Sequence, residues 1–236
     1  MVANNFKRRQ IRMDSHNSAL YGKVFENFSK KGTFSFGPLT SDKLRRDPQY
    51  VMFQMSRYKH VARMFSHKRN VLDIGSGDGI GLPILSSYFK NVTALDVDPI
   101  MSAQCEKNLD SAFNCSFLRH DFYTAPLQQK FDLAVCFDVL SSINPEQETP
   151  WFENIVKSLD QNGIFVIGTQ NRNTARYSNP ESRVEQPNFK DFFELEALFS
   201  SYFQNHLILS MNDETIHTGK RETCQYFIAS GIGIKN

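Results

Sequence analysis

An α/β fold is predicted for the 236-residue chain, with a mostly parallel sheet covered by helices on both faces. From about residue 70 onward, short apolar segments alternate with segments of helical spacing, which is the pattern of a parallel sheet with crossover helices. The chain is 40% hydrophobic and 13% aromatic, which is enough for a packed core and unlike a disordered protein. Its length suits one sizeable domain with a small helical extension.

Two helical segments precede the alternating part of the chain. Residues 14–31 and 48–65 each place apolar side chains three or four positions apart, as on one face of a helix. Between them, residues 30–42 contain two glycines and a proline and are predicted to form a loop. The helices are expected to form a cap over residues 1–67, ahead of a core over residues 68–236.

The alternating part predicts its elements in order. Asp98 can cap the helix that begins at Pro99, and Asn144 with Pro145 marks the start of a later helix. Helices are expected over residues 81–89, 98–109, 144–159 and 191–202. Strands are expected over residues 71–74, 91–97, 114–122, 130–140, 163–169, 206–210 and 223–229.

The first predicted strand runs into a glycine-rich turn, in the stretch LDIGSGDG. A dinucleotide fingerprint needs glycine at its first, third and sixth positions, and the sixth position here is Ile80. Asp73 and Asp78 would also repel a pyrophosphate. They suit a ligand that is cationic at this point, such as S-adenosylmethionine with its ammonium and sulfonium groups. The glycines then serve a close approach of the backbone to that ligand.

With this turn, the chain resembles the class I S-adenosylmethionine-dependent methyltransferases. The stretches LDIGSGDG, VTALDVD, RHDF and FDLAVCFDVLSSI match the family's successive motifs in order, between about residues 70 and 169. The resemblance implies a Rossmann-like fold with a mostly parallel seven-stranded sheet, and S-adenosylmethionine as the cofactor. We expect this fold to carry the N-terminal helices as a cap.

The resemblance also implies the residues that contact the donor. The acid and glycines of the turn would surround its methionine part, and Asp96 would hold both ribose hydroxyls. Val97 and the segment after the third strand would meet the adenine, while the fourth strand and the following loop would face cofactor and substrate. The predicted donor-binding residues are Asp73, Gly75, Ser76, Gly77, Gly79, Asp96, Val97, Asp121, Phe122 and Phe137.

Two segments outside these motifs are similar to a subgroup of bacterial methyltransferases associated with surface-polysaccharide or capsule gene clusters. These are RDPQYVMFQMSRYKHVA before the core and MNDETIHTG near the C-terminus. The chain departs from the wider pattern at Ser141 and Ser142, where many relatives carry Glu-His, so a catalytic role at that position does not transfer.

A general base for a hydroxyl acceptor is predicted in the polar stretch NDETIHTG. His217 is the candidate base because histidine titrates near neutral pH, and Asp213 or Glu214 could orient its ring. The alternative is a surface turn whose acids cap backbone amides. Asp138 with these three residues could also surround a hard cation, although their spacing does not require one and no metal is expected.

Other polar residues could take part in binding or have a purely structural role. Arg172, Arg176 and Arg183, in the long polar segment after the fifth strand, could bind an anionic group on the acceptor, or simply be solvated. Tyr58 and His60 are expected to pack rather than to react.

The composition and charge of the chain limit which binding partners and which cellular location we expect. The net charge of +2 gives no broad field for nucleic acid, so a nucleic-acid partner is not expected. The four cysteines are scattered singly and suggest neither a disulfide framework nor a zinc site, which fits the cytoplasm. No apolar run reaches the roughly 20 residues of a membrane span, and the basic N-terminus lacks the apolar segment of a secretory signal.

The predicted function is therefore methyl transfer to a small polar acceptor, with the hydroxyl of a sugar, sugar nucleotide or related metabolite as the leading expectation. Three alternatives stay open: a protein or RNA methyltransferase, a non-catalytic relative that binds the donor, and a nicotinamide-dependent oxidoreductase. The broken glycine spacing and Asp73 oppose the last. The stretch FDVL replaces the Asn/Asp-Pro-Pro-Tyr/Phe signature of methyltransferases that act on adenine or glutamine.

Overall fold

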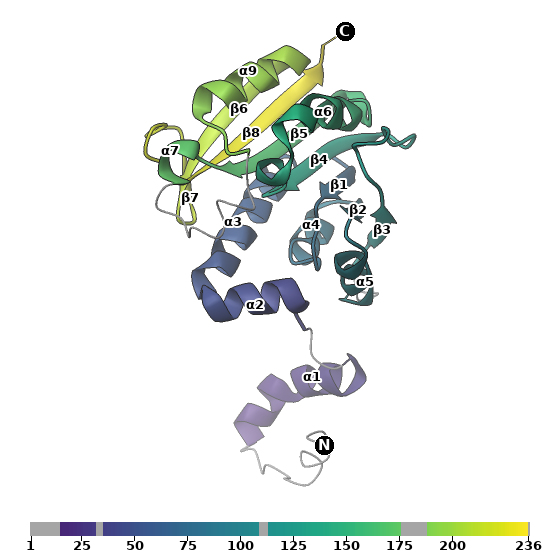
Figure 1. The fold of residues 1–236 in the computed structure, drawn as a ribbon. Coiled ribbons are helices and arrows are strands. Elements are labelled where there is room, and N and C mark those ends of the chain that lie inside the picture. Colours follow the sequence, from purple (N-terminus) through teal and green to yellow (C-terminus); the bar gives the residue numbers. More distant parts are fainter. Residues whose placement is uncertain (1–14, 32–34, 109–112, 176–187, 236) are drawn as a thin grey trace. The chain divides into compact units, whose positions relative to one another are not determined.

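Figure 1 shows the computed structural model of the chain, which describes residues 15–31, 35–108, 113–175 and 188–235. The chain divides after Ser35 into two compact units, Met1–Ser35 and Phe36–Asn236. The first unit contains helix α1 (Ser15–Lys31), as the helical spacing predicted. All other described helices and strands belong to the second unit.

The second unit is built on a mixed sheet in the order β3-β2-β1-β4-β5-β8-β6-β7. The first five strands of this order are parallel, whereas β8 runs antiparallel between β5 and β6, and β7 is antiparallel to β6. The strands are β1 (Asn70–Ile74), β2 (Asn91–Asp96), β3 (Cys115–Arg119), β4 (Phe131–Phe137), β5 (Leu159–Gln170), β6 (Phe203–Asn212), β7 (Thr215–His217) and β8 (Tyr226–Ile234).

The seven-stranded sheet of the sequence analysis is corrected to eight strands. The additional strand, β7, forms a hairpin with β6 through a turn in which Asp213 has a φ of 50°. Aspartate tolerates this left-handed conformation better than most residues. β7 is short and polar, so it has no apolar alternation by which a strand could be predicted.

Helices flank the sheet on both faces (Figure 1). Asp47 caps α3 by accepting a bond from the Gln49 amide, and Asp191 forms a reciprocal capping box with Glu194 at the start of α9. The helices are α2 (Pro38–Arg46), α3 (Pro48–Met64), α4 (Leu82–Tyr88), α5 (Pro99–Asn108), α6 (Glu148–Val156), α7 (Arg172–Ala175) and α9 (Phe192–Tyr202), with short 3-10 turns at Leu140–Ser142 and Pro145–Gln147.

The predicted loop over residues 30–42 is wrong at its C-terminal end, because α2 begins at Pro38. Gly37 is the extended N-cap residue and Pro38 occupies the first turn, where its missing N–H costs no hydrogen bond. The same Gly-Pro pair that interrupts one helix thus begins the next.

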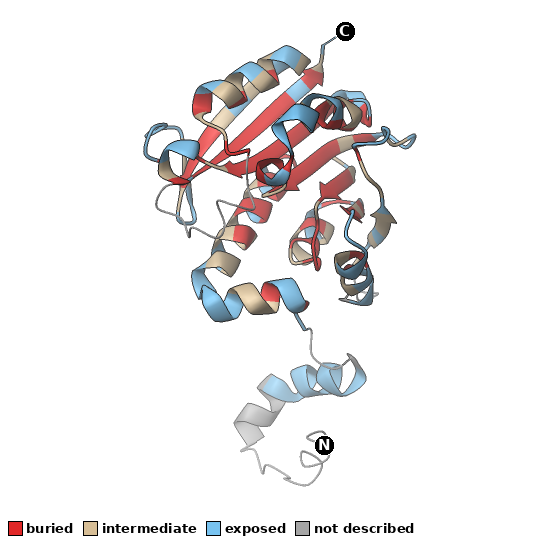
Figure 2. Ribbon diagram, viewed as in Figure 1, coloured by how far each residue is buried: buried red, intermediate tan, exposed pale blue. Residues whose placement is uncertain are grey.

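The core lies on both faces of the sheet, and Figure 2 shows that strands β1, β4 and β8 are mostly buried, whereas β3 at the edge is not. Alternate residues of β4 divide between the two sides: Cys136 packs with α6 and α9, whereas Val135 packs with α3 and α4. α3 contributes buried Val61 and Ala62 to the second cluster, so it packs within the same compact unit as the sheet. The predicted division between residues 67 and 68 stays a prediction.

Across the described ranges, no helix combines the length and the apolar composition that crossing a bilayer requires.

Candidate functional site

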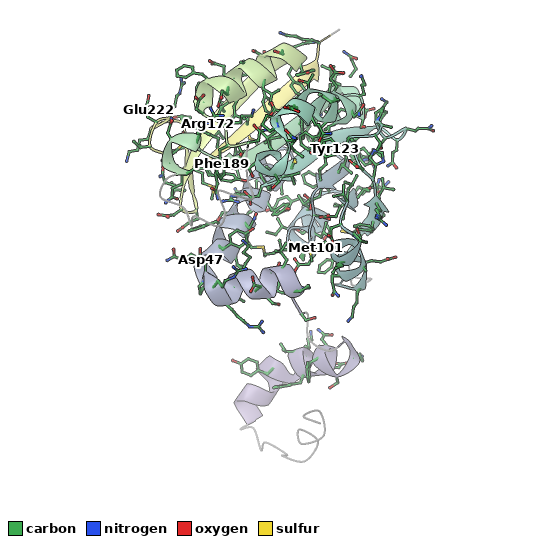
Figure 3. The ribbon with its side chains drawn as sticks, in the orientation of Figure 1. Asp47, Met101, Tyr123, Arg172, Phe189 and Glu222 are labelled. Carbon is green, nitrogen blue, oxygen red and sulfur yellow. The ribbon has the colours of Figure 1, made fainter. Side chains whose placement is uncertain are left out.

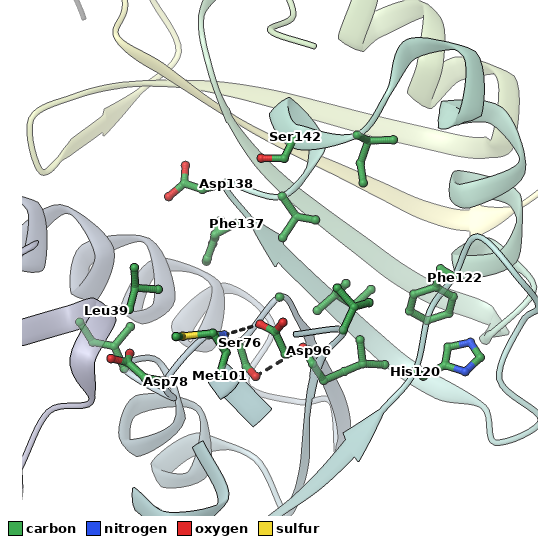
Figure 4. A pocket seen from close by; sticks show the side chains of 18 of the residues that line it. Leu39, Ser76, Asp78, Asp96, Met101, His120, Phe122, Phe137, Asp138 and Ser142 are labelled. Carbon is green, nitrogen blue, oxygen red and sulfur yellow. Dashed lines mark hydrogen bonds between the residues drawn. The ribbon is translucent and has the colours of Figure 1, made fainter. Parts of the chain in front are cut away.

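A cavity of about 310 Å³ opens at the carboxyl ends of β1, β2, β3 and β4. The strand order continues from β1 to β2 and β3 on one side and to β4 and β5 on the other. In open α/β folds, ligands bind at the carboxyl ends of the strands where the order reverses in this way. Figure 4 shows Asp138 and Ser142 on one side of the cavity, His120 and Phe122 at the other end, and Asp96 between. Residues of α2 and α3, including Leu39 and Tyr50, complete the wall.

The glycine turn after β1 forms the floor of the cavity. Gly75, Gly77 and Gly79 have φ values of 72°, 55° and 88°, a conformation that favours glycine. A Cβ atom on Gly75 would also lie 2.2 Å from Cγ2 of Val139. The amides of Gly75 and Ser76 donate to the Leu95 carbonyl at 2.8 and 3.0 Å, which ties the turn to β2.

Asp96 ends β2 beside this turn. Its Oδ2 accepts the Gly77 amide and its Oδ1 accepts the Asp98 amide, each at 2.9 Å. Each carboxylate oxygen can accept more than one hydrogen bond, so Asp96 can also bind hydroxyls of a ligand in the cavity. Val97, which is 54% exposed, lies beside it on the cavity wall.

The predicted donor-binding residues line the cavity except for two, Asp73 and Gly79. Gly79 faces Cys105 and Leu82. Asp73 is fully buried behind the turn, where the Tyr58 hydroxyl donates to its two oxygens at 3.2 and 3.4 Å. Burial raises the pKa of Asp73 to about 7, and the charge of Asp96 adds to this rise, whereas the Tyr58 bond opposes it.

Asp78, the second acid of the turn, joins the turn to α2. Its carboxylate accepts the backbone amide of Thr40 at 2.7 Å and the Thr40 hydroxyl at 2.6 Å. Thr40 is 3% exposed, and both residues line the cavity. The acid that the sequence assigned to a cationic ligand therefore also holds the helix that closes one side of the site.

We expect Thr40→Val to loosen α2, because the substitution keeps the shape of the side chain but removes the hydroxyl that bonds to Asp78. A lost bond to a charged group costs about 1.5–3 kcal/mol of stability. The melting temperature should fall by several degrees, and amide exchange should accelerate in α2. Thr40→Ser, which keeps the hydroxyl, should melt close to the wild type; equal losses in both variants would contradict this role of the hydroxyl.

A polar network on α3 was not predicted from the sequence. Asp138, which follows β4, accepts from Gln54 Nε2 at 2.7 Å and from Arg57 Nη1 at 2.8 Å. Gln54 Nε2 also donates to the Tyr50 hydroxyl at 2.6 Å, and the Arg57 guanidinium lies 3.6 Å from the centre of the Tyr226 ring. Asp138 and Arg57 are separated by 81 positions, so no local spacing links them.

His217 lies on β7 and does not line this cavity. Its Nε2 bonds to Asn212 Oδ1 at 2.9 Å and its Nδ1 accepts the Gly219 amide at 3.3 Å, so these bonds of the ring go to neither Asp213 nor Glu214. Glu214 instead lines a separate, shallow groove with residues of α3. Among the described residues, no group of three or more His, Cys, Asp or Glu side chains is arranged to hold a metal ion.

Arg172, considered above either as a contact for an anionic group on the acceptor or as a solvated side chain, forms hydrogen bonds within the protein. Its guanidinium donates to the Phe189 carbonyl at 2.6 and 3.0 Å and to Glu194 at 2.5 Å, and Figure 3 shows Arg172 close to Phe189. Arg176 and Arg183 lie outside the described residues.

Comparison with known proteins finds similarity to methyltransferases in the segment that carries most residues of this site. Residues 71–163 match the family described as "Methyltransferase domain". A "Ubiquinone biosynthesis O-methyltransferase" of Rickettsia bellii is 27% identical over 112 residues, covering 45% of this chain and 44% of that protein. A mitochondrial protein of the same name from Schizosaccharomyces pombe is 29% identical over 112 residues, covering 46% and 40%. The chain thus spans less than half the length of these relatives.

Solved methyltransferases share the fold. The N-methyltransferase NodS from Bradyrhizobium japonicum, in complex with S-adenosyl-L-homocysteine, matches 77% of this chain and 87% of its own with a TM-score of 0.59 and 19% identity. An S-adenosylmethionine-dependent methyltransferase from Clostridium acetobutylicum matches 91% and 99% with a TM-score of 0.62 and 14% identity. The predicted Rossmann-like fold is confirmed. Together, the matched segment, the named relatives and the fold support the predicted S-adenosylmethionine-dependent methyltransferase class and its cofactor, and residues 71–163 are the part of the chain that matches the methyltransferase family.

Proposed function

We propose that the chain transfers the methyl group of S-adenosylmethionine to a hydroxyl of a small polar acceptor. One observation supports this most directly: a single cavity joins the glycine turn and Asp96 to a polar wall that contains Tyr50 and Asp138. The first part suits the donor, and the second suits an uncharged acceptor group. Because methyl transfer is an in-line displacement, much of the catalysis can come from holding the two reactants together.

The donor is proposed to lie along the floor of the cavity. Gly75 and Gly77 allow the backbone to approach its methionine part, and Asp96 accepts its two ribose hydroxyls. The adenine would lie between Val97 and the segment that contains Asp121 and Phe122. When bound, the donor supplies an electrophilic methyl group on a sulfonium, while these residues supply only its position.

The acidic lining favours a hydroxyl over an anionic acceptor group. Asp78 and Asp138 both line the cavity, and Arg57, which could otherwise attract an anion, is paired with Asp138. A sugar or sugar nucleotide could place a hydroxyl here, and so could an intermediate of ubiquinone biosynthesis, the pathway in the relatives' names. The subgroup of surface-polysaccharide methyltransferases belongs to the first possibility and stays a proposal.

Helices α2 and α3, which precede the sheet in the sequence, are proposed to act as a cap on this site. Leu39 and Thr40 of α2, together with Tyr50 and Gln54 of α3, line the cavity and so separate its contents from solvent on one side. A closed site suits a small-molecule acceptor better than a macromolecule. Cytoplasmic location stays a prediction from composition.

The acceptor class is tested with methyl-labelled S-adenosylmethionine and a panel of acceptors. The panel contains monosaccharides, sugar nucleotides, intermediates of ubiquinone biosynthesis and, for comparison, primary amines. We expect S-adenosylhomocysteine to form only with hydroxyl compounds, and mass spectrometry should find the label on oxygen. Transfer to the amines alone would overturn the proposal and place the chain with N-methyltransferases.

The sequence-based hypothesis that His217 supplies a general base is tested by His217→Ala. If His217 is the base, turnover falls about 100-fold or more with donor affinity unchanged. Because both ring nitrogens bond to Asn212 and Gly219 and the ring does not line the cavity, we expect turnover to stay within about threefold of wild type. A large loss of turnover at unchanged melting temperature would instead support His217, with Asp213 and Glu214, as the catalytic group.

A further inference from the structure

We infer that Asp138 and Tyr50 form the acceptor-binding pair of the site, in which Asp138 takes the proton of the reacting hydroxyl and Tyr50 donates a hydrogen bond to the acceptor. This inference rests on the proposed function, because it assigns the group that receives the acceptor. Both residues line the cavity, yet they come from different elements, Tyr50 from α3 and Asp138 from the end of β4.

The Tyr50 hydroxyl has its proton available for a ligand. Gln54 uses one amide hydrogen on Asp138 and the other on the Tyr50 oxygen, so the tyrosine accepts in this bond and does not donate. Burial, with the charge of Asp138 adding to it, raises the pKa of Tyr50 to about 12, which keeps the phenol protonated at neutral pH. Tyr50 therefore presents an O–H donor on the cavity wall.

Asp138, the other member of this pair, has an unusual backbone conformation. Its φ is 62°, and its amide donates to the Gly168 carbonyl at 3.0 Å. Backbone conformations of this kind concentrate at functional sites, where surrounding bonds maintain them. The bonds from Gln54 and Arg57 both reach Oδ2, and 26% of the side chain is exposed, so the carboxylate can still accept from a cavity ligand.

Arg57 acts as a positioning residue for this carboxylate. It is 7% exposed, and its guanidinium packs on the Tyr226 ring while Nη1 donates to Asp138. The positive charge of Arg57 balances the negative charge of Asp138. The cavity wall at Asp138 therefore attracts a protonated amine less than an unpaired carboxylate would. The carboxylate itself disfavours a carboxyl or phosphoryl group. A neutral hydroxyl, which can donate to Asp138 while accepting from Tyr50, is the group that matches this wall.

The proposed methyl transfer needs no reactant or catalytic group besides the donor, the acceptor hydroxyl and the Asp138 carboxylate. The acceptor oxygen forms a bond to the methyl carbon as the carbon–sulfur bond breaks, and the electron pair of that bond stays on sulfur, which becomes neutral. The hydroxyl proton passes to the Asp138 carboxylate, which later releases it to solvent. Asp138 is thus the general base of the step.

Asp138→Asn tests the base. Asparagine tolerates a positive φ and keeps an oxygen that can accept from Gln54 and Arg57, so the variant should fold. We expect kcat to fall 100-fold or more, while the dissociation constant of S-adenosylhomocysteine stays within threefold of wild type. The loss should shrink for more acidic hydroxyl acceptors, because these depend less on a base; a merely structural role would affect all acceptors equally. Asp42→Asn, an exposed acid on α2, is the matched control.

Tyr50→Phe tests the donor. Removing one neutral hydrogen bond should raise KM for the acceptor about 5- to 10-fold with little change in kcat or in donor affinity. Tyr88→Phe, on the exposed side of α4, is the control and should behave as wild type. The inference is overturned if Asp138→Asn keeps more than a third of wild-type turnover on hydroxyl acceptors. If the wild type itself methylates no hydroxyl, the proposed function fails and the inference fails with it.

Discussion

Replacing Asp96 by alanine is expected to weaken the binding of S-adenosylhomocysteine at least 100-fold. Asp96 would lose two charge-assisted bonds to the ribose hydroxyls, and bonds of this kind contribute about 1.5–3 kcal/mol each. The substitution also releases the amides of Gly77 and Asp98, which the two carboxylate oxygens hold at 2.9 Å. A loss of about 3 kcal/mol corresponds to more than a 100-fold change in the dissociation constant.

Isothermal titration calorimetry measures this effect without an acceptor. Asp96→Asn is the informative companion, because it keeps one oxygen for the turn and the ligand, and it should bind with intermediate affinity. Asp160→Ala, an exposed acid at the start of β5, controls for the loss of a negative charge. An affinity of the Asp96→Ala protein within threefold of wild type would contradict the placement of the ribose.

Replacing Asp73 by asparagine is expected to change how stability depends on pH. The pKa of Asp73 is raised from 3.8 to about 7 in the folded protein, chiefly by burial. Between these values the unfolded chain releases its proton before the folded protein does, so the free energy of unfolding falls as the pH rises from about 4 to 7. Each unit of the shift corresponds to about 1.4 kcal/mol, so the effect reaches several kcal/mol.

The amide that this substitution introduces does not titrate, so the pH dependence should disappear in Asp73→Asn. Relative to the wild type, the melting temperature of the variant should rise steadily between pH 5 and pH 7.5 and then level off. The difference between the curves is the informative quantity, because the new buried amide can lower stability by the same amount at every pH. Asp132→Asn, an acid on β4 that accepts the amides of Arg69 and Asn70, is the control. Parallel curves for wild type and Asp73→Asn would contradict the raised pKa.

The part of the cavity proposed to hold the donor could be predicted from the sequence because its determinants are local. The glycines of the turn and the acid at the end of β2 occur at fixed distances from strands that apolar periodicity identifies. The positive φ values of Gly75, Gly77 and Gly79 show why those positions carry glycine. Asp73 belongs to the same motif, but only the packing of α3 shows that it lies behind the turn and bonds to Tyr58.

The proposed acceptor side could not be predicted in this way, since it depends on contacts between distant segments. Arg57 and Asp138 meet only because α3 packs across the carboxyl end of β4, and no spacing in the sequence indicates that arrangement. His217 was predicted as the general base because histidine titrates near neutral pH, but its ring lies in the β6–β7 hairpin and does not line the cavity. In the sequence that hairpin resembles a polar loop, because a three-residue strand has no periodic signal.

Calorimetric titration of the purified protein with S-adenosylhomocysteine, and in parallel with a nicotinamide dinucleotide, tests most directly which ligand the cavity holds. We predict stoichiometric binding of S-adenosylhomocysteine in the micromolar range and no measurable heat from the dinucleotide, because the acidic glycine turn disfavours a pyrophosphate. Binding of the dinucleotide with no response to S-adenosylhomocysteine would contradict the proposed donor site and the acceptor pair built on it.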